Sequence, residues 1–180
     1  MKKLKLIIFS GILCLCSVKA LAVWPTKPEY DSVVNDFRQE LGLNGFTLDT
    51  CSEFRWVDTV CCKQSGPDYN ADKWYPVLLG KGDTLVGGYP GQSAYYTISA
   101  YYLTCNRDTA NYWEGLQVKS SPRYGYRTRV TYYVVKNNST IALIGKALNN
   151  PQYGKGGAWQ FYVPNYSTML DSVDIKNIIP

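Results

Sequence analysis

The basic side chains of this sequence are concentrated in one long stretch. Residues 115–170 hold seven lysines and arginines and no acid, whereas residues 23–114 hold twelve acids and seven bases. The seven basic residues are Lys119, Arg123, Arg127, Arg129, Lys136, Lys146 and Lys155. Arginine can donate two parallel hydrogen bonds to a carboxylate, sulfate or phosphate. The pattern therefore predicts a surface that binds an anion, or one that the acidic half of the chain neutralises.

A predicted hairpin brings some of these charges together. Asn137-Asn138 separates two β-rich segments, 126–136 and 139–147, and asparagine tolerates the positive φ of a two-residue loop. In that register Arg129 lies opposite Lys146, and Arg127 follows on the same face. Like charges directly opposite each other destabilise a sheet. We therefore expect Arg127, Arg129 and Lys146, with Arg123 nearby, to bind an anion unless acidic side chains cover them.

Aromatic residues accompany the basic ones. The sequence has 16 tyrosines and 5 tryptophans, and Trp113, Tyr124 and Tyr126 lie in polar or glycine-containing segments beside the basic residues. A tyrosine or tryptophan ring offers a large apolar face together with a polar group, which suits stacking on a sugar or contact with a protein. These three rings are the predicted stacking residues of the anion site.

The chain has no histidine, and this excludes several kinds of catalysis. Ser-His-Asp and Cys-His pairs, the usual catalytic zinc sites and an imidazole pH switch all need that side chain. A hydrolase would have to use two carboxylates, for which Glu53 and Glu114 are candidates. Because no nucleotide-loop or calcium-loop motif is present, we expect no cofactor and no metal.

The first 22 residues have the features of a secretory signal peptide: lysines, an apolar run from Leu4, and Ala20-Leu21-Ala22. Cleavage there would leave residues 23–180 as a single secreted domain, extracellular or periplasmic. An exported chain with an even number of cysteines favours disulfides. We expect two among Cys51, Cys61, Cys62 and Cys105, with the pairing open and a four-thiolate zinc site as the alternative.

Hydrophobic periodicity predicts one helix followed by a β-rich body. Residues 27–41 repeat apolar side chains at helical spacing, and Gly42 follows as a stop. Strands are expected at 53–62, 74–79, 93–105, 126–136, 139–147, 159–163 and near 172–179. The fold class is mainly β, an antiparallel sandwich or open barrel of about seven or eight strands with one N-terminal amphipathic helix.

These observations favour a secreted, disulfide-containing binding protein. Its partner would be an anionic glycan or a cell-surface or extracellular protein, and export argues against nucleic acid. The first alternative is a membrane-active, pore-forming toxin, in which helix 27–41 leaves the body and lies on a membrane surface. The second is the histidine-free carboxylate hydrolase.

Overall fold

The computed structural model describes residues 27–41, 57, 60, 64, 72–105 and 108–178. The predicted signal peptide (1–22), Glu53, Cys51, Cys61 and Cys62 lie outside these residues. The described elements are α1 Lys27–Leu41, β1 Tyr75–Leu79, β2 Thr84–Gly87, β3 Tyr95–Thr97, α3 Ser99–Thr104, α4 Thr109–Gly115, β4 Arg129–Val135, β5 Thr140–Lys146, β6 Trp159–Tyr162, α5 Tyr166–Met169 and β7 Leu170–Asn177.

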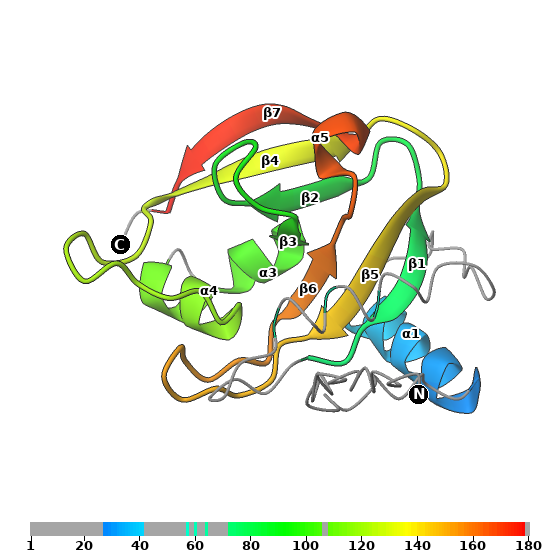
Figure 1. The fold of residues 1–180 in the computed structure, drawn as a ribbon, viewed down its shortest axis with the longest axis horizontal. Helices are drawn as coiled ribbons and strands as arrows, with labels where there is room; N and C mark the ends of the chain where they lie inside the picture. The colour runs from blue at the N-terminus through cyan, green and yellow to red at the C-terminus, as the bar shows by residue number, and fades with distance from the viewer. Residues whose placement is uncertain are drawn as a thin grey trace, which may run out of the picture.

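The seven strands form one antiparallel sheet in the order β1-β5-β6-β3-β2-β4-β7. Figure 1 shows the sheet in two differently directed parts: β2, β4 and β7 cross the top, and β6, β5 and β1 descend beside them. The short helices α3 and α4 lie together on one side, under β2. The predicted fold class, mainly β and antiparallel with an N-terminal helix, is confirmed.

Helix α1 packs its apolar stripe into the core. Tyr30, Val34 and Phe37 are buried, and Phe37 meets the rings of Trp159 and Phe161 edge-on at centroid distances of 5.1 and 5.5 Å. The Tyr30 hydroxyl donates a 2.5 Å hydrogen bond to the Pro76 carbonyl on β1. The amphipathic pattern of residues 27–41 therefore reflects packing against the sheet.

The predicted hairpin between β4 and β5 is wrong. Strand β4 pairs with β2 and β7, whereas β5 pairs with β1 and β6, so residues 136–139 cross from one part of the sheet to the other. Arg129 lies opposite Asn177, and Lys146 lies opposite Trp159. Both strands carry apolar residues on both faces, so alternation alone could not choose their partners. The like-charge pair that motivated the anion cluster does not exist.

Two other strand predictions are also wrong. The segment expected as one strand from Ser93 to Cys105 divides into β3 and α3. Val57 and Val60, within the strand expected at 53–62, have helical backbone and buried side chains. In both segments large apolar residues occur at spacings that fit more than one period, and tertiary packing decides the outcome.

Cys105 is a free, buried thiol, which corrects the prediction that it forms a disulfide. It lies in the aromatic cluster of Tyr102 and Tyr112, and burial raises the pKa of its thiol. The disulfide prediction depended on cysteine count and export alone. Those features cannot show that a cysteine is enclosed by aromatic rings.

Candidate functional site

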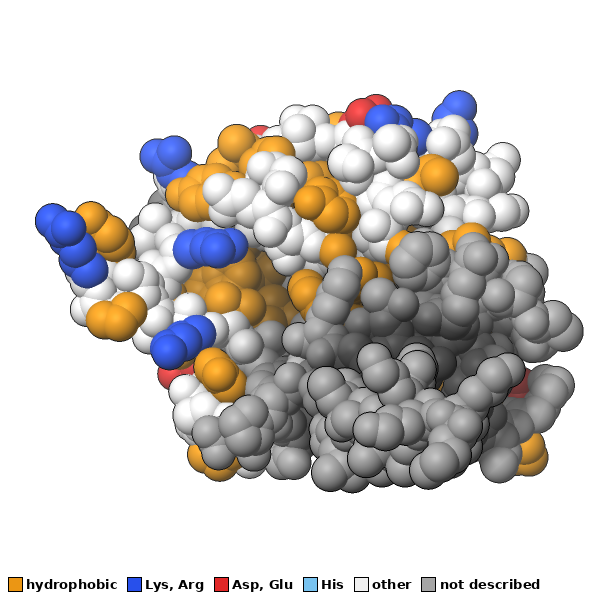
Figure 2. All heavy atoms as spheres, viewed as in Figure 1, with side chains coloured by type: hydrophobic (Ala, Val, Ile, Leu, Met, Phe, Trp, Pro, Cys, Tyr) orange, Lys and Arg blue, Asp and Glu red, His pale blue; other side chains and the backbone are white. Residues whose placement is uncertain are grey.

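A partly open pocket with a cavity volume of about 50 Å³ lies between the sheet and α4. Its lining comes from the end of β2 and the turn after it (Val86, Gly87, Gly88), from the start of β3 (Ser93, Tyr95, Tyr96), from α4 and its continuation (Tyr112, Trp113, Leu116, Val118), and from Arg127 and Gln160. In Figure 2 a hollow with an apolar floor has basic side chains around it.

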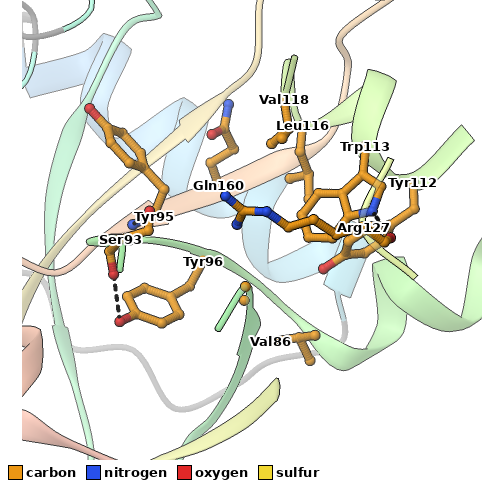
Figure 3. Close-up of a pocket in the computed structure, with 12 residues that line it drawn as sticks. Val86, Ser93, Tyr95, Tyr96, Tyr112, Trp113, Leu116, Val118, Arg127 and Gln160 are labelled. Carbon is orange, nitrogen blue, oxygen red and sulfur yellow. Dashed lines mark hydrogen bonds between the residues drawn. The ribbon is translucent and has the colours of Figure 1, made fainter. Parts of the chain in front are cut away.

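Arg127 brings the positive charge to this pocket. Its side chain extends across the pocket, as Figure 3 shows, and its backbone carbonyl accepts a 2.7 Å hydrogen bond from Trp113 Nε1. A Cβ on Gly88 would lie 2.6 Å from Arg127 Nη1, so this glycine leaves room for the guanidinium. No acidic residue lines the pocket, and within the described ranges no carboxylate forms an ion pair with Arg127. The guanidinium is therefore available to an anion.

Aromatic rings form the walls, and hydrogen bonds and ring contacts hold them. The Tyr96 hydroxyl donates to the Ser93 carbonyl at 2.9 Å, and its ring meets that of Tyr133 edge-on at 5.0 Å. Tyr133 in turn donates a 2.8 Å hydrogen bond to the Gly88 carbonyl. On the opposite wall, Trp113 is 3% exposed. These contacts fix the positions of the rings.

Gln160 supplies a polar group from β6. Its Nε2 donates to Asp72 Oδ2 at 3.3 Å, and Asp72 also accepts from Gln64 Nε2 and from the Leu148 backbone N–H, at 2.8 and 2.7 Å. Asp72 is 2% exposed, and its burial raises the pKa of the carboxyl group. This buried network fixes the amide of Gln160.

The structure brings together two of the seven predicted binding residues, Trp113 and Arg127. Arg123 and Tyr124 are exposed at a turn where their side chains form a cation–π pair at 5.2 Å. The Tyr126 hydroxyl donates to Glu114 Oε1 at 3.5 Å.

The remaining two lie elsewhere on the sheet. Arg129 is exposed at the start of β4, and Lys146 lies over the Trp159 ring at 5.4 Å. The predicted four-residue cationic cluster therefore does not form. Arg127 alone among its members lines the pocket.

Sequence reasoning missed Gln160, Tyr95, Tyr96 and the Gly87-Gly88 turn. One signal was available for Gln160, which is the single polar residue in the strand Trp-Gln-Phe-Tyr, all four of whose residues are buried. A buried polar side chain needs a partner and therefore points to a network or a site. The glycine pair carried a similar signal, because glycine allows a side chain to approach the backbone closely.

The arrangement of the described residues does not support the hydrolase alternative. Glu114 bonds to Tyr126 outside the pocket lining, and Glu53 is outside the described ranges. Nor does the part of the chain that is described contain a group of three or more acidic or cysteine side chains placed to hold a metal ion. None of the described helices is long and apolar enough to cross a membrane.

Comparison with known proteins identifies the class. Residues 59–165 match the family described as the Rhs1 C-terminal toxin domain. A chain in the solved structure "Rhs1-CT in complex with cognate immunity protein RhsI1" is 36% identical, with a TM-score of 0.56 over 63% of this chain and 86% of that one. A chain in "Structure of Tse6 in complex with Tsi6" is 16% identical, with a TM-score of 0.42 over 69% of this chain and 99% of that one. Curated proteins gave no match.

The protein is a toxin domain. The family match spans 107 of 180 residues, more than half, so the chain belongs to the Rhs1 C-terminal toxin domain family. Of the alternative drawn from the sequence, a membrane-active toxin, the assignment as a toxin is confirmed. The comparisons do not support the leading hypothesis, a secreted glycan-binding protein, nor do they support a membrane partner.

Proposed function

We propose that this toxin domain acts on a phosphorylated ring compound of the nucleotide class, bound in the Arg127 pocket. The observation that carries the proposal is the unpaired guanidinium of Arg127 between walls of tyrosine and tryptophan. A guanidinium matches the geometry of a phosphate, and aromatic faces accept a planar base by stacking. A ligand that carries both groups satisfies the two halves of the pocket at once.

Other ligand classes fit the pocket less well. A simple anion would leave the aromatic walls empty, and a neutral sugar would leave the guanidinium without a counter-charge. A charge-assisted hydrogen bond contributes about 1.5–3 kcal/mol, and one stacked base contributes about 1–3 kcal/mol. Contributions of similar size from both ends of the ligand support a nucleotide over either fragment.

We also propose that a cognate immunity protein neutralises the chain. The support is the similar solved chain, 36% identical, which is in complex with its cognate immunity protein. The exposed, acid-free turn around Arg123 and Tyr124 offers a basic and aromatic contact surface for an acidic partner face. Selecting open reading frames of the source genome for restored growth during toxin expression should return a protein that forms a stoichiometric complex with the toxin. Survivors that carry only toxin mutations would argue against a partner.

The pocket proposal is tested with two matched substitutions. Arg127→Ala and Arg129→Ala remove the same charge, but only Arg127 lines the pocket. On expression in a bacterial host, the wild type and Arg129→Ala should arrest growth and change the cellular nucleotide pool, measured by chromatography. Arg127→Ala should lose both effects at equal protein level. Equal toxicity of the three proteins would overturn the assignment of the pocket.

A further inference from the structure

Trp113 makes hydrogen bonds to both ends of the segment that leads to Arg127. Its backbone carbonyl accepts a 2.9 Å hydrogen bond from the Val118 N–H, and its indole Nε1 donates a 2.7 Å hydrogen bond to the Arg127 carbonyl. Figure 3 shows the indole nitrogen directed at the backbone of Arg127. A single residue of α4 therefore contacts both ends of residues 118–127, which we call the basic loop.

The outer part of the basic loop is held by its own bonds. Ser121 and Gly125 exchange backbone hydrogen bonds at 2.9 and 2.8 Å, and the Tyr124 N–H donates to Ser121 Oγ at 3.3 Å. A long hydrogen bond, 3.5 Å, joins Tyr126 Oη to Glu114 Oε1 on α4. The tip is therefore held internally and only weakly by α4, so the position of the loop depends on the contacts at its base.

Arg127 lies at that base, just before the sheet begins. The carbonyl of the next residue, Thr128, accepts a 2.6 Å hydrogen bond from the Ile178 N–H, and β4 starts one residue later. The carbonyl of Arg127 precedes this ladder and is bound by Trp113. The Trp113 hydrogen bond thus fixes the backbone of Arg127 where the pairing of the strands does not.

The indole of Trp113 is itself fixed in the core. It is 3% exposed, meets the ring of Tyr112 edge-on at 4.7 Å, and belongs to a cluster with Val86 of β2 and Val130 of β4. An indole N–H can only donate, and a buried donor needs an acceptor. Because so little of this ring is exposed, its hydrogen bond to Arg127 is a stronger basis for a role in binding than its face.

We propose that Trp113 is a positioning residue that acts through Arg127: its indole N–H holds the Arg127 backbone so that the guanidinium extends across the pocket beside Gly88. A Cβ on Gly88 would lie 2.6 Å from Arg127 Nη1, so the guanidinium lies close against that turn, and a displaced backbone would carry it away. This inference rests on the proposed function of the pocket. It replaces the stacking role that the sequence suggested for Trp113.

The test compares two Trp→Phe substitutions. Trp113→Phe removes the N–H that binds Arg127, whereas Trp74→Phe removes an N–H that donates to Gln64 Oε1 at 2.8 Å, from a side chain that is 1% exposed and outside the pocket lining. AMP and adenosine are titrated by calorimetry into the wild type, both variants, Arg127→Ala and the double variant Trp113→Phe/Arg127→Ala. Hydrogen exchange of the basic loop and urea unfolding are measured on the same proteins.

Trp113→Phe should bind AMP about threefold to tenfold more weakly than the wild type and bind adenosine equally well, because only the phosphate contact depends on the guanidinium. Its basic loop should exchange faster than that of Trp74→Phe. Trp74→Phe should keep the AMP affinity of the wild type, although it also loses an indole hydrogen bond. Adding Trp113→Phe to Arg127→Ala should not weaken AMP binding further, since the effect passes through Arg127.

Each contrary outcome has a distinct meaning. Wild-type AMP affinity in Trp113→Phe, together with weakened binding in Arg127→Ala, would overturn the positioning role and leave the proposed function in place. Weaker adenosine binding by Trp113→Phe would also overturn it, because the ring would then contact the ligand directly.

Two further measurements keep the inference testable. Should phenylalanine prevent folding, benzothienylalanine in place of Trp113 keeps the bicyclic ring and removes only the N–H, and the same results are expected. Failure of the wild type to bind either AMP or adenosine would refute the proposed function. Unchanged exchange of the basic loop in Trp113→Phe would separately refute the hold of Trp113 on Arg127.

Discussion

Replacing Gly88 with alanine should disable the pocket without harming the fold. The new Cβ would lie 2.6 Å from Arg127 Nη1, about 1 Å closer than a normal van der Waals contact. The atom that must move is the far end of a flexible, exposed side chain, whereas the backbone of Gly88 stays in place. We therefore expect the guanidinium to leave its position against the turn.

The size of the effect follows from the bond that is lost. A charge-assisted hydrogen bond contributes about 1.5–3 kcal/mol, which corresponds to roughly a 10- to 150-fold loss of nucleotide affinity. The fold should change by less than about 1 kcal/mol, since alanine also restricts the unfolded chain relative to glycine. Gly80→Ala is the matched control, because its Cβ would meet Asp83 at 3.7 Å, an ordinary contact distance.

Calorimetric titration and urea unfolding of the three proteins test this prediction. Gly88→Ala should lose nucleotide affinity to the same extent as Arg127→Ala, and its free energy of unfolding should equal that of the wild type. Gly80→Ala should equal the wild type in both nucleotide affinity and free energy of unfolding. Unchanged nucleotide affinity in Gly88→Ala would refute the reasoning that the position of the guanidinium determines binding. Loss of affinity accompanied by loss of stability would show that the glycine supports the fold.

Three further predictions concern stability, each measured by urea unfolding. Phe37→Ala should lower the free energy of unfolding by about 3–5 kcal/mol, and a loss below about 1 kcal/mol would indicate that α1 detaches. Gly87→Ala should cost about 1–3 kcal/mol, since its Cβ would lie 2.7 Å from the buried Tyr96 ring, and a neutral result would contradict that packing. Because burial raises the pKa of Asp72 above 3.8, its folded form binds the proton more tightly. The stability of wild type relative to Asp72→Asn should therefore fall as pH rises from 3.8 through the folded pKa, and a relative stability that rises over this range would contradict the raised pKa.

Sequence patterns correctly predicted the helices and strands whose apolar periodicity is clear within the segment itself. The helix at 27–41 has an apolar stripe of one period, and the strands containing Tyr75 and Trp159 are short apolar runs with clear ends. The sheet order was beyond such reasoning. Asn137-Asn138 has the composition of a tight turn, yet β4 and β5 have different neighbours on both sides. Strand pairing depends on contacts among distant segments, which a single sequence does not display.

Only part of the candidate site was predicted, because the rest of it also depends on contacts among distant segments. Arg127 and Trp113 were singled out by charge and residue type, and the structure joins them in one pocket. Arg129 and Lys146 were added through a register that does not form. Gln160 and Asp72 matter because of their burial and their hydrogen-bond partners, and these properties appear only once β6 and the segment before β1 are assembled.

The most direct test of the central claim is a double-mutant cycle between the protein and its ligand. AMP and adenosine differ by the phosphate, and wild type and Arg127→Ala differ by the guanidinium, so four calorimetric titrations give the coupling between the two groups. We expect the wild type to prefer AMP to adenosine by roughly tenfold or more and Arg127→Ala to bind the two alike. An equal preference for AMP in both proteins would contradict it.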